Sequence, residues 1–417
     1  MIQYAKATMN NGLKLIIHQD NSTTMAAINL LYDVGAKDES TDKTGTAHLL
    51  EHLMFSGSGN IASYDREVQK AAGENNAFTS NDITNYYIQL PAENLETGLW
   101  LESDRMLGLN FTQEAFDIQK NVVIEEYKQR YLNQPYGDIW MLLRPFVYKN
   151  HPYRWPAIGS DLSHIENITL DDIKQFYYEH YCPSNAILSI AGNVGKSQCI
   201  ELVEKWFGTI PRRKNKKRQL PQEPVQVNPG KMEVTRDVPY HELIIAFRMG
   251  HRLSPEYYVV DLISDLFAGG KSSILYRHLV INRNMFSKLD AYITGDIDPG
   301  MFIIRGRLTR GTEMADAYKE VFKEIEDFIS AQPGKYELEK VKNKLESTRQ
   351  YMHTDIINKA MDLAYHELLG NAGRLNDEIG KYREVSARSI QKTARSLFQL
   401  NNSSTLFYYS NNKNQQF

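Results

Sequence analysis

A charged stretch near the middle of the chain, RRKNKKRQLPQEP at 212–224, is flanked by proline and shows no apolar periodicity. Its composition is typical of a solvated interdomain linker, although a nucleic-acid or membrane patch would also fit the charge run. The expected order of strands and helices before this stretch recurs after it. Because the same order appears in both halves, the sequence predicts one α+β unit that is present twice.

We therefore predict an α+β fold of two similar domains, each a mostly antiparallel sheet packed with helices, with boundaries at 1–211 and 225–417 around the linker 212–224. The second domain lacks the histidine motif of the first. For the first half the patterns predict a hairpin turning at 10–12, a strand at 25–35, a helix from 46, strands within 76–90, helices at 113–131 and 170–181, and a strand at 185–194. For the second half they predict strands at 230–238 and 241–250, a helix at 255–267, strands at 287–296 and 300–309, and long helices from 312 to 400.

Composition excludes several classes of function. The 417 residues carry a formal net charge of −3, which leaves no excess of basic residues for a phosphate backbone, so we expect no nucleic-acid partner. No run of apolar residues is long enough for a membrane-spanning helix, and MIQYAKATMNNGLKLIIH does not read as a secretory signal. The two cysteines are too few for a disulfide framework, so the cytoplasm is the expected compartment.

Two histidines and one glutamate lie within five positions of TAHLLEHLMFSGS, residues 46–58. On a helix, His48 and His52 stand one turn apart on the same face, about 6 Å along the axis. Both imidazoles can therefore reach one ion, and neutral imidazole is a good zinc ligand. Glu51 lies beside that ion and can take a proton from water as a general base.

The arrangement H-x-x-E-H reverses the commoner H-E-x-x-H and belongs to the inverzincin motifs. A histidine that only caps the helix or packs in the core is the alternative. A catalytic zinc site needs a third protein ligand, which the helical segment QKNVVIEEYKQRY offers as Glu125 or Glu126. A pair of acids after an apolar triplet could equally mark the point where a helix emerges into water.

Three segments occur in the order and spacing of one known family: HLLEH, NNAFTSNDITNYY and VVIEEYKQRY. Together with GG-x-SS-x-LY at 269–276, they resemble the pitrilysin and mitochondrial processing peptidase family of zinc metallopeptidases, in its bacterial two-domain form. The resemblance covers nearly the whole chain. It implies a Zn²⁺ cofactor held by His48, His52 and Glu126, with Glu51 as the base and Glu125 as the fallback ligand.

The resemblance also gives the NNAFT segment a role. In this family the corresponding strand is an exposed sheet edge beside the metal, and the peptide substrate adds to it as a further strand. Asn76 and Ala77 are the substrate-binding positions that this implies. A core strand with a polar turn is the alternative for the segment.

The chain departs from the family at two places. Seven residues before Glu126 the family usually has a second, supporting glutamate, and here Gln119 stands there. An amide can still bond to a ligand but carries no charge. In the second half, Val280 and Ser287 occupy the positions of an arginine and a tyrosine that bind the substrate carbonyl, and Arg283 is off register. Each missing donor could cost on the order of a hundredfold in rate.

We therefore predict a zinc-dependent endopeptidase that cleaves extended peptides or small unfolded proteins within a two-lobed chamber. A related chain without the zinc motif is expected to supply the arginine and tyrosine in a dimer, and a homodimer is the other possibility. The alternatives are a non-catalytic assembly subunit of the same family and a zinc hydrolase that acts on a small molecule.

Overall fold

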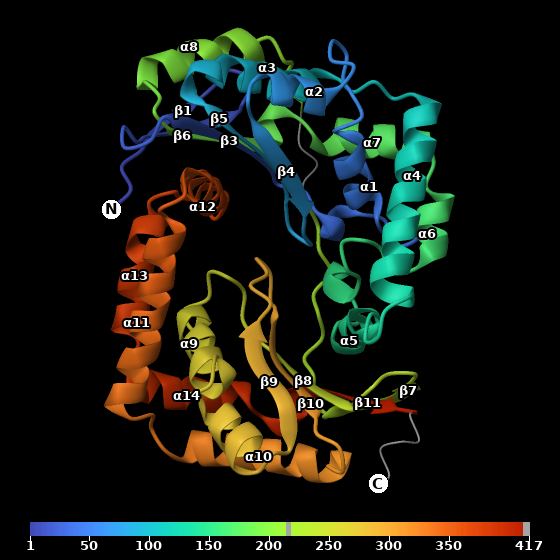
Figure 1. The fold of residues 1–417 in the computed structure, drawn as a ribbon, viewed down its shortest axis with the longest axis vertical. Coiled ribbons are helices and arrows are strands. Elements are labelled where there is room, and N and C mark those ends of the chain that lie inside the picture. The colour runs from blue at the N-terminus through green and yellow to red at the C-terminus, as the bar shows by residue number, and fades with distance from the viewer. Residues whose placement is uncertain (214–217, 412–417) are drawn as a thin grey trace. The chain divides into compact units, whose positions relative to one another are not determined.

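The structure is a computed structural model, and it describes residues 1–213 and 218–411 of the chain (Figure 1). The described chain forms two compact units that are interleaved in sequence. Unit 1 comprises Met1–Leu132, His151–Pro221 and Gln350–Asp377. Unit 2 comprises Asn133–Asn150, Gln222–Arg349 and Glu378–Phe417, of which 412–417 lie outside the described residues. The domain boundaries expected from the sequence stay a prediction, and residues 214–217 of the expected linker lie outside the described chain as well.

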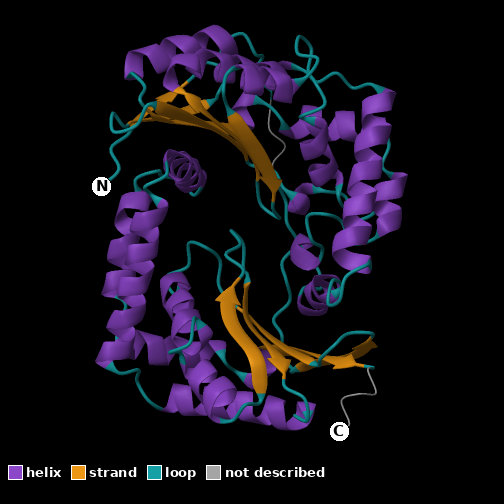
Figure 2. Ribbon diagram, viewed as in Figure 1, coloured by secondary structure: helices purple, strands orange, loops and turns teal. Residues whose placement is uncertain are grey.

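Unit 1 is built on a six-stranded sheet (Figure 2). The strand order is β1-β2-β6-β3-β5-β4, in which only β2 and β6 pair in parallel. β4 forms one edge of this sheet and pairs with β5 alone. The strands are β1 (Ala5–Thr8), β2 (Lys14–Gln19), β3 (Met25–Tyr32), β4 (Glu74–Thr79), β5 (Thr84–Pro91) and β6 (Ala186–Gly192).

Unit 2 repeats this topology with five strands. Its order, β7-β11-β8-β10-β9, matches β2-β6-β3-β5-β4 when the strands of each unit are taken in chain order, and its one parallel pair, β7 with β11, stands at the matching place. The prediction of two similar α+β domains with mostly antiparallel sheets is therefore confirmed. The strands are β7 (Gly230–Arg236), β8 (Glu242–Arg248), β9 (Phe286–Ile293), β10 (Met301–Leu308) and β11 (Ser403–Ser410).

Helices cover the sheets. In unit 1, α3 and α8 pack on one side of the sheet and α12 packs on β3 and β6. The helices of this unit are α1 (Thr46–Leu53), α2 (Tyr64–Lys70), α3 (Leu95–Leu107), α4 (Gln113–Tyr127), α6 (Leu162–Asn167), α7 (Leu170–His180), α8 (Lys196–Phe207) and α12 (Ile356–Leu368). The other helices are α5 (Ile139–Val147), α9 (Tyr257–Ala268), α10 (Met314–Ser330), α11 (Lys335–Met352), α13 (Arg374–Glu384) and α14 (Ala387–Leu397).

Neighbouring residues of β3 point to opposite sides of the sheet of unit 1, one toward α3 and the other toward α12. A Cβ on Gly98 of α3 would lie 2.5 Å from Cδ1 of Ile28, so glycine allows this helix to approach the sheet closely. The adjacent Ala27 points to the other side, because successive side chains of a strand alternate, and there it packs with Ile356 and Ala360 of α12. A helix from late in the chain thus completes the core of the first sheet.

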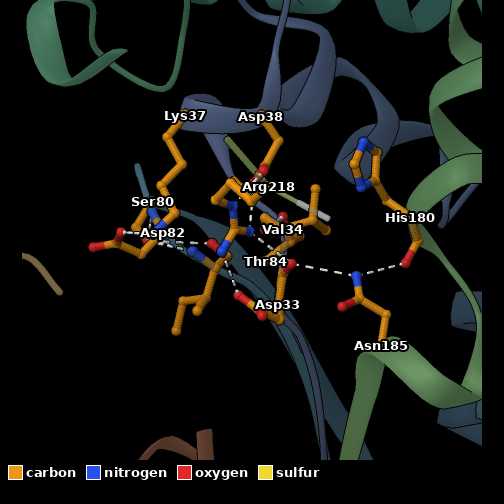
Figure 3. A network of polar contacts seen from close by, with 12 residues as sticks. Asp33, Val34, Lys37, Asp38, Ser80, Asp82, Thr84, His180, Asn185 and Arg218 are labelled. Carbon is orange, nitrogen blue, oxygen red and sulfur yellow. Dashed lines mark hydrogen bonds and ion pairs between the residues drawn. The ribbon is translucent and has the colours of Figure 1, made fainter. Parts of the chain in front are cut away.

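A polar network fixes the loop between β3 and α1 (Figure 3). Arg218 binds Asp38 with an Nε to Oδ1 distance of 2.6 Å and Asp33 with an Nη1 to Oδ1 distance of 3.1 Å. Thr84 of β5 donates to the carbonyl of Val34 at 3.0 Å. Because this loop leads directly into α1, the network helps to set where α1 begins.

None of the helices in the described residues is both long and apolar enough to cross a membrane. The two cysteines, Cys182 and Cys199, are both buried and free.

Candidate metal centre

α1 brings the two histidines of the H-x-x-E-H motif side by side. Their ring centroids lie 4.8 Å apart and the rings are nearly perpendicular, at 82°. Leu49, Leu50 and Leu53 of the same helix are buried in the core of unit 1. The apolar residues thus orient α1, and this leaves His48 and His52 on the remaining face.

α4 supplies an acid to the same point. Oε2 of Glu126 lies 3.8 Å from Nε2 of His48 and 3.5 Å from Nε2 of His52. These separations are long for hydrogen bonds but close to the roughly 3.3 Å expected between two ligand atoms on one tetrahedral zinc, given bonds of about 2.0–2.1 Å. In the described chain, these three side chains form a group that could hold a metal ion, with ligand atoms within 4.8 Å of one another. Two imidazoles and one carboxylate are the donor set of a catalytic zinc site, so the residues fit the implied ion.

The neighbouring acid of the pair points elsewhere. The side chain of Glu125 is 70% exposed and pairs with Lys128 at 2.7 Å, whereas that of Glu126 is 18% exposed. The expected helix 113–131 ends its α-helical part at Tyr127, and a π-helical turn follows over Lys128–Leu132. Arg130 in this turn reaches back to Oε1 of Glu126 at 3.0 Å. π-helical turns are frequent at functional sites.

Burial and charge tune the three groups differently. Burial lowers the pKa of His48 to about 4, which keeps this imidazole neutral at pH 7. Burial also acts to lower the pKa of His52, but the Glu126 carboxylate outweighs it and the pKa of His52 is raised. Contact with His52 lowers the pKa of Glu126, so the carboxylate stays charged. Neutral imidazole and charged carboxylate are the forms that bind metal.

Glu51 lies on α1 between the histidines and is held by a residue of β4. The hydroxyl of Thr79 donates to Oε2 of Glu51 at 2.5 Å. Burial raises the pKa of Glu51, and Thr79 opposes that effect. A carboxylate whose pKa is raised is a stronger base, which suits a group that accepts a proton.

The site opens into one cavity of unit 1, and the site residues proposed from the sequence in this unit line it, except the fallback ligand Glu125. Asn76 and Ala77 come from the edge strand β4, and Gln119 comes from α4, where it helps to raise the pKa of His52. Four further residues of the cavity wall were not predicted from the sequence: Phe55, Phe78, Thr79 and Arg130. Thr79 could have been found from its place two residues after Ala77 on the same strand, and Arg130 from its place one helical turn after Glu126.

A buried glutamate holds the start of α1. Glu39 accepts hydrogen bonds from the backbone N–H groups of Gly45, at 3.0 Å, and Ala47, at 2.8 Å. Gly45 itself has φ of +97°, and a Cβ there would lie 2.7 Å from the carbonyl oxygen of Ile158. Both features fix where the helix begins, and therefore the direction in which its histidines point.

Replacing Glu39 with Gln is expected to change how stability depends on pH. Burial raises the pKa of Glu39 from its ordinary 4.5 to about 8, against the opposing effect of its two amide donors. Between these values the folded protein binds a proton that the unfolded chain releases, so the free energy of unfolding falls as pH rises. Urea unfolding at pH 5 and pH 7 measures this. From pH 5 to pH 7 the free energy of unfolding of the wild type should fall by about 1 kcal/mol or more relative to that of Glu39→Gln. Parallel pH dependence in the two proteins would contradict this.

The two departures in the second half both lie in unit 2. Val280, in the π-helical turn Tyr276–Asn282, is partly buried against the core of that unit. Ser287, on β9, donates from Oγ to the backbone carbonyl of Arg307 at 3.3 Å. Valine has no donor, and the short hydroxyl of Ser287 is already bonded within unit 2, so neither replaces the arginine or the tyrosine.

Each half of the chain matches a model of a known protein family. Residues 14–141 match the model described as Insulinase (Peptidase family M16), and residues 167–345 match the model described as Peptidase M16 inactive domain. The chain belongs to peptidase family M16. The M16 match in the first half contains the candidate metal centre, and the second half matches the inactive domain of the family.

Similar M16 proteins are named as zinc proteases. Zinc protease PqqE of Helicobacter pylori is 28% identical over 97% of this chain and 92% of its own length. The uncharacterized zinc protease YmxG of Bacillus subtilis is 25% identical over 94% of this chain and 95% of its own length. The family match and these names support a peptidase-like function for the chain.

Solved structures share the fold. The crystal structure of a protease from Helicobacter pylori superimposes with a TM-score of 0.92 at 26% identity, covering 98% of this chain and all of that one. Pitrilysin superimposes with a TM-score of 0.81 at 16% identity, covering 98% of this chain and 45% of pitrilysin. The likeness to pitrilysin concerns the fold alone.

Proposed function

We propose that this chain is a zinc-dependent endopeptidase that cleaves extended peptides or small unfolded proteins. The observation that carries the proposal is the convergence of His48, His52 and Glu126 beside Glu51 and the edge strand β4. In the proposal, His48, His52 and Glu126 hold the zinc ion. Bound zinc supplies Lewis-acid chemistry, which makes water more acidic and polarises a peptide carbonyl.

Glu51 handles the proton in this proposal. Its Oε2 is engaged by Thr79, and no hydrogen bond from the described residues reaches Oε1. Oε1 is therefore the atom that accepts the proton of the attacking water and passes it to the leaving amine nitrogen. Gln119 supports the site through His52, without the charge of a carboxylate.

The edge strand β4 is the surface that we propose for the peptide. The N–H of Ala77 donates to its neighbour's side-chain oxygen, Oδ1 of Asn76, at 2.8 Å. A substrate carbonyl can replace this side-chain oxygen as the acceptor, and Asn76 is then free to bind the substrate. Main-chain pairing of this kind binds many sequences, because it does not depend on the side chains of the peptide.

Replacing Ala77 with Pro tests the role of this strand. Proline removes the N–H while β4 stays extended, so KM is expected to rise by about tenfold with little change in kcat. Steady-state kinetics on a fluorogenic peptide measures both constants. Ala77→Gly keeps the N–H and serves as the matched control, and an unchanged thermal midpoint shows that the sheet is intact. An unchanged KM in the proline variant would exclude this hydrogen bond from substrate binding.

We further propose that a related chain without the zinc motif completes the active site in a dimer. The support is the pair Val280 and Ser287, because valine has no donor for a negative carbonyl oxygen and the Ser287 hydroxyl already donates to the carbonyl of Arg307. The isolated chain with zinc is expected to cleave peptides at least about a hundredfold more slowly than the chain mixed with such a partner. Peptidase assays combined with native mass spectrometry test this. Full activity from the monomer would rule out the dependence on a partner but would still agree with a zinc peptidase.

The cytoplasm remains the predicted compartment.

A further inference from the structure

Unit 2 carries a cluster of two arginines around one buried acid. Oε2 of Glu242 on β8 lies 2.6 Å from Nη2 of Arg305, and Oε1 lies 2.8 Å from Nη2 of Arg307, both on β10. The Nε atoms of the arginines donate to the same two oxygens at 2.7 Å and 3.0 Å. The side chain of Glu242 is 2% exposed, while those of Arg305 and Arg307 are 31% and 37% exposed. A buried carboxylate therefore holds two guanidinium groups that still reach solvent.

Each arginine keeps unused donors. Arg305 and Arg307 bind Glu242 through Nε and Nη2, and among the described residues no hydrogen-bond acceptor meets the Nη1 of either. The two side chains lie on the same face, because they are two positions apart on one strand. Opposite them on β9, Lys288 and Asp290 pair with each other at 3.1 Å and cancel in charge. Two arginines against one glutamate leave one net positive charge for a ligand.

A strained tyrosine supports the cluster from one side. Tyr136 has φ of +65°, a left-handed conformation that is unfavourable for a residue with a Cβ. Its hydroxyl donates to the carbonyl of Tyr240 and accepts from the N–H of the same residue, both at 3.0 Å. The guanidinium of Arg307 lies 4.8 Å from the centroid of its ring. Backbone strain of this kind gathers at functional sites, where the surroundings hold it in place.

We propose that Arg305 and Arg307 form a binding site for one carboxylate of a peptide. A guanidinium presents its N–H groups in a planar fork that matches a carboxylate, and Glu242 and Tyr136 hold the two forks before the ligand arrives. The proposal rests on the proposed function only in taking the ligand to be a peptide. The carboxylate belongs either to an acidic side chain or to the free C-terminus, since both offer the same chemistry.

Calorimetric titration of the full chain carrying Glu51→Gln, which is expected not to cut peptides, tests the proposal. The first peptide has one glutamate and an amidated C-terminus, the second has glutamine and a free C-terminus, and the third has glutamine and an amidated C-terminus. We expect at least one of the first two to bind about tenfold more tightly than the third. Whichever of the two binds more tightly identifies the source of the carboxylate.

Single substitutions locate the site. Arg305→Gln and Arg307→Gln should each remove most of the tenfold preference, and Arg307→Lys should restore only part of it, because lysine keeps the charge but lacks the planar fork. Arg310→Gln is the matched control, since Arg310 is exposed and lies just beyond the end of β10. A change of preference in this control equal to that in Arg305→Gln would reveal a general charge effect and overturn the site.

The comparison of the three peptides uses the Glu51→Gln chain with both arginines present, so it remains valid even if an arginine variant fails to fold. Equal affinity for all three peptides, or no binding of any, overturns the inference. If the Glu51→Gln chain binds a carboxylate selectively but the wild-type chain with zinc, alone or mixed with its partner, cleaves no peptide, the proposed function is contradicted and the site stands. If the wild-type chain cleaves peptides but the Glu51→Gln chain shows no preference for a carboxylate, the arginine site is overturned and the proposed function stands.

Discussion

Replacing Glu51 with Gln is expected to lower kcat by about a thousandfold while the protein keeps its zinc. Glutamine is nearly the same size, and its amide oxygen can still accept the hydrogen bond from Thr79, so the local structure should persist. What it loses is the ability to accept a proton, and a positioned general base contributes about 10²–10⁴-fold to rate. Cleavage of a fluorogenic peptide gives kcat, and elemental analysis of the same sample gives the zinc content.

The two readouts separate the possible roles of Glu51. Loss of zinc in Glu51→Gln would make this residue a ligand and reverse the assignment. Retention of both zinc and full kcat would mean that another group accepts the proton. Only an inactive protein that still holds zinc agrees with a base that does not bind the metal.

Replacing Glu126 with Gln is expected to weaken zinc binding by more than about a hundredfold and to abolish cleavage with it. The substitution removes the one negative charge in a donor set that otherwise consists of two neutral imidazoles. His48→Ala should likewise lose metal and activity together. Competition with a chromophoric chelator measures the zinc affinity of each variant independently of activity.

Glu125→Gln is the matched control for this experiment. It makes the same chemical change one position earlier on the same helix, at a side chain that points to solvent and pairs with Lys128. We expect its zinc affinity and kcat to stay at the level of the wild type. If Glu126→Gln still bound zinc tightly and Glu125→Gln lost zinc binding, Glu125 rather than Glu126 would be the zinc ligand.

The local half of the candidate site could be predicted from spacing alone. His48, Glu51 and His52 lie within five positions, and helical geometry then places them on neighbouring parts of one face whatever the rest of the chain does. The choice between Glu125 and Glu126 could not be made in this way. One residue corresponds to about 100° around a helix, so the choice depends on which face of α4 packs toward α1.

The fold was predictable to a similar degree. The strands β2, β3 and β8 agree with the apolar runs that the sequence shows, because buried strands need such runs. The predicted strand β7 is instead a half-exposed edge strand without an apolar run. Strand β11 (Ser403–Ser410) was not predicted, since its segment SSTLFYYS follows a long series of helices. Its place between β7 and β8 is the position that β6 holds in the other sheet, and this match became visible only with the strand order.

The sequence alone predicts a duplicated α+β chain and places two histidines and a glutamate together on one helix, where they can form part of a metal site. These features are predictable because periodicity and motif spacing depend only on short stretches of sequence. The tertiary structure decided that Glu126 meets the histidines, that Thr79 holds Glu51, that α12 completes the core of the first sheet, and that Glu242 gathers two arginines. Each of these contacts joins segments far apart in the chain. Contacts of this kind depend on how whole elements pack, and local sequence patterns carry no record of that packing.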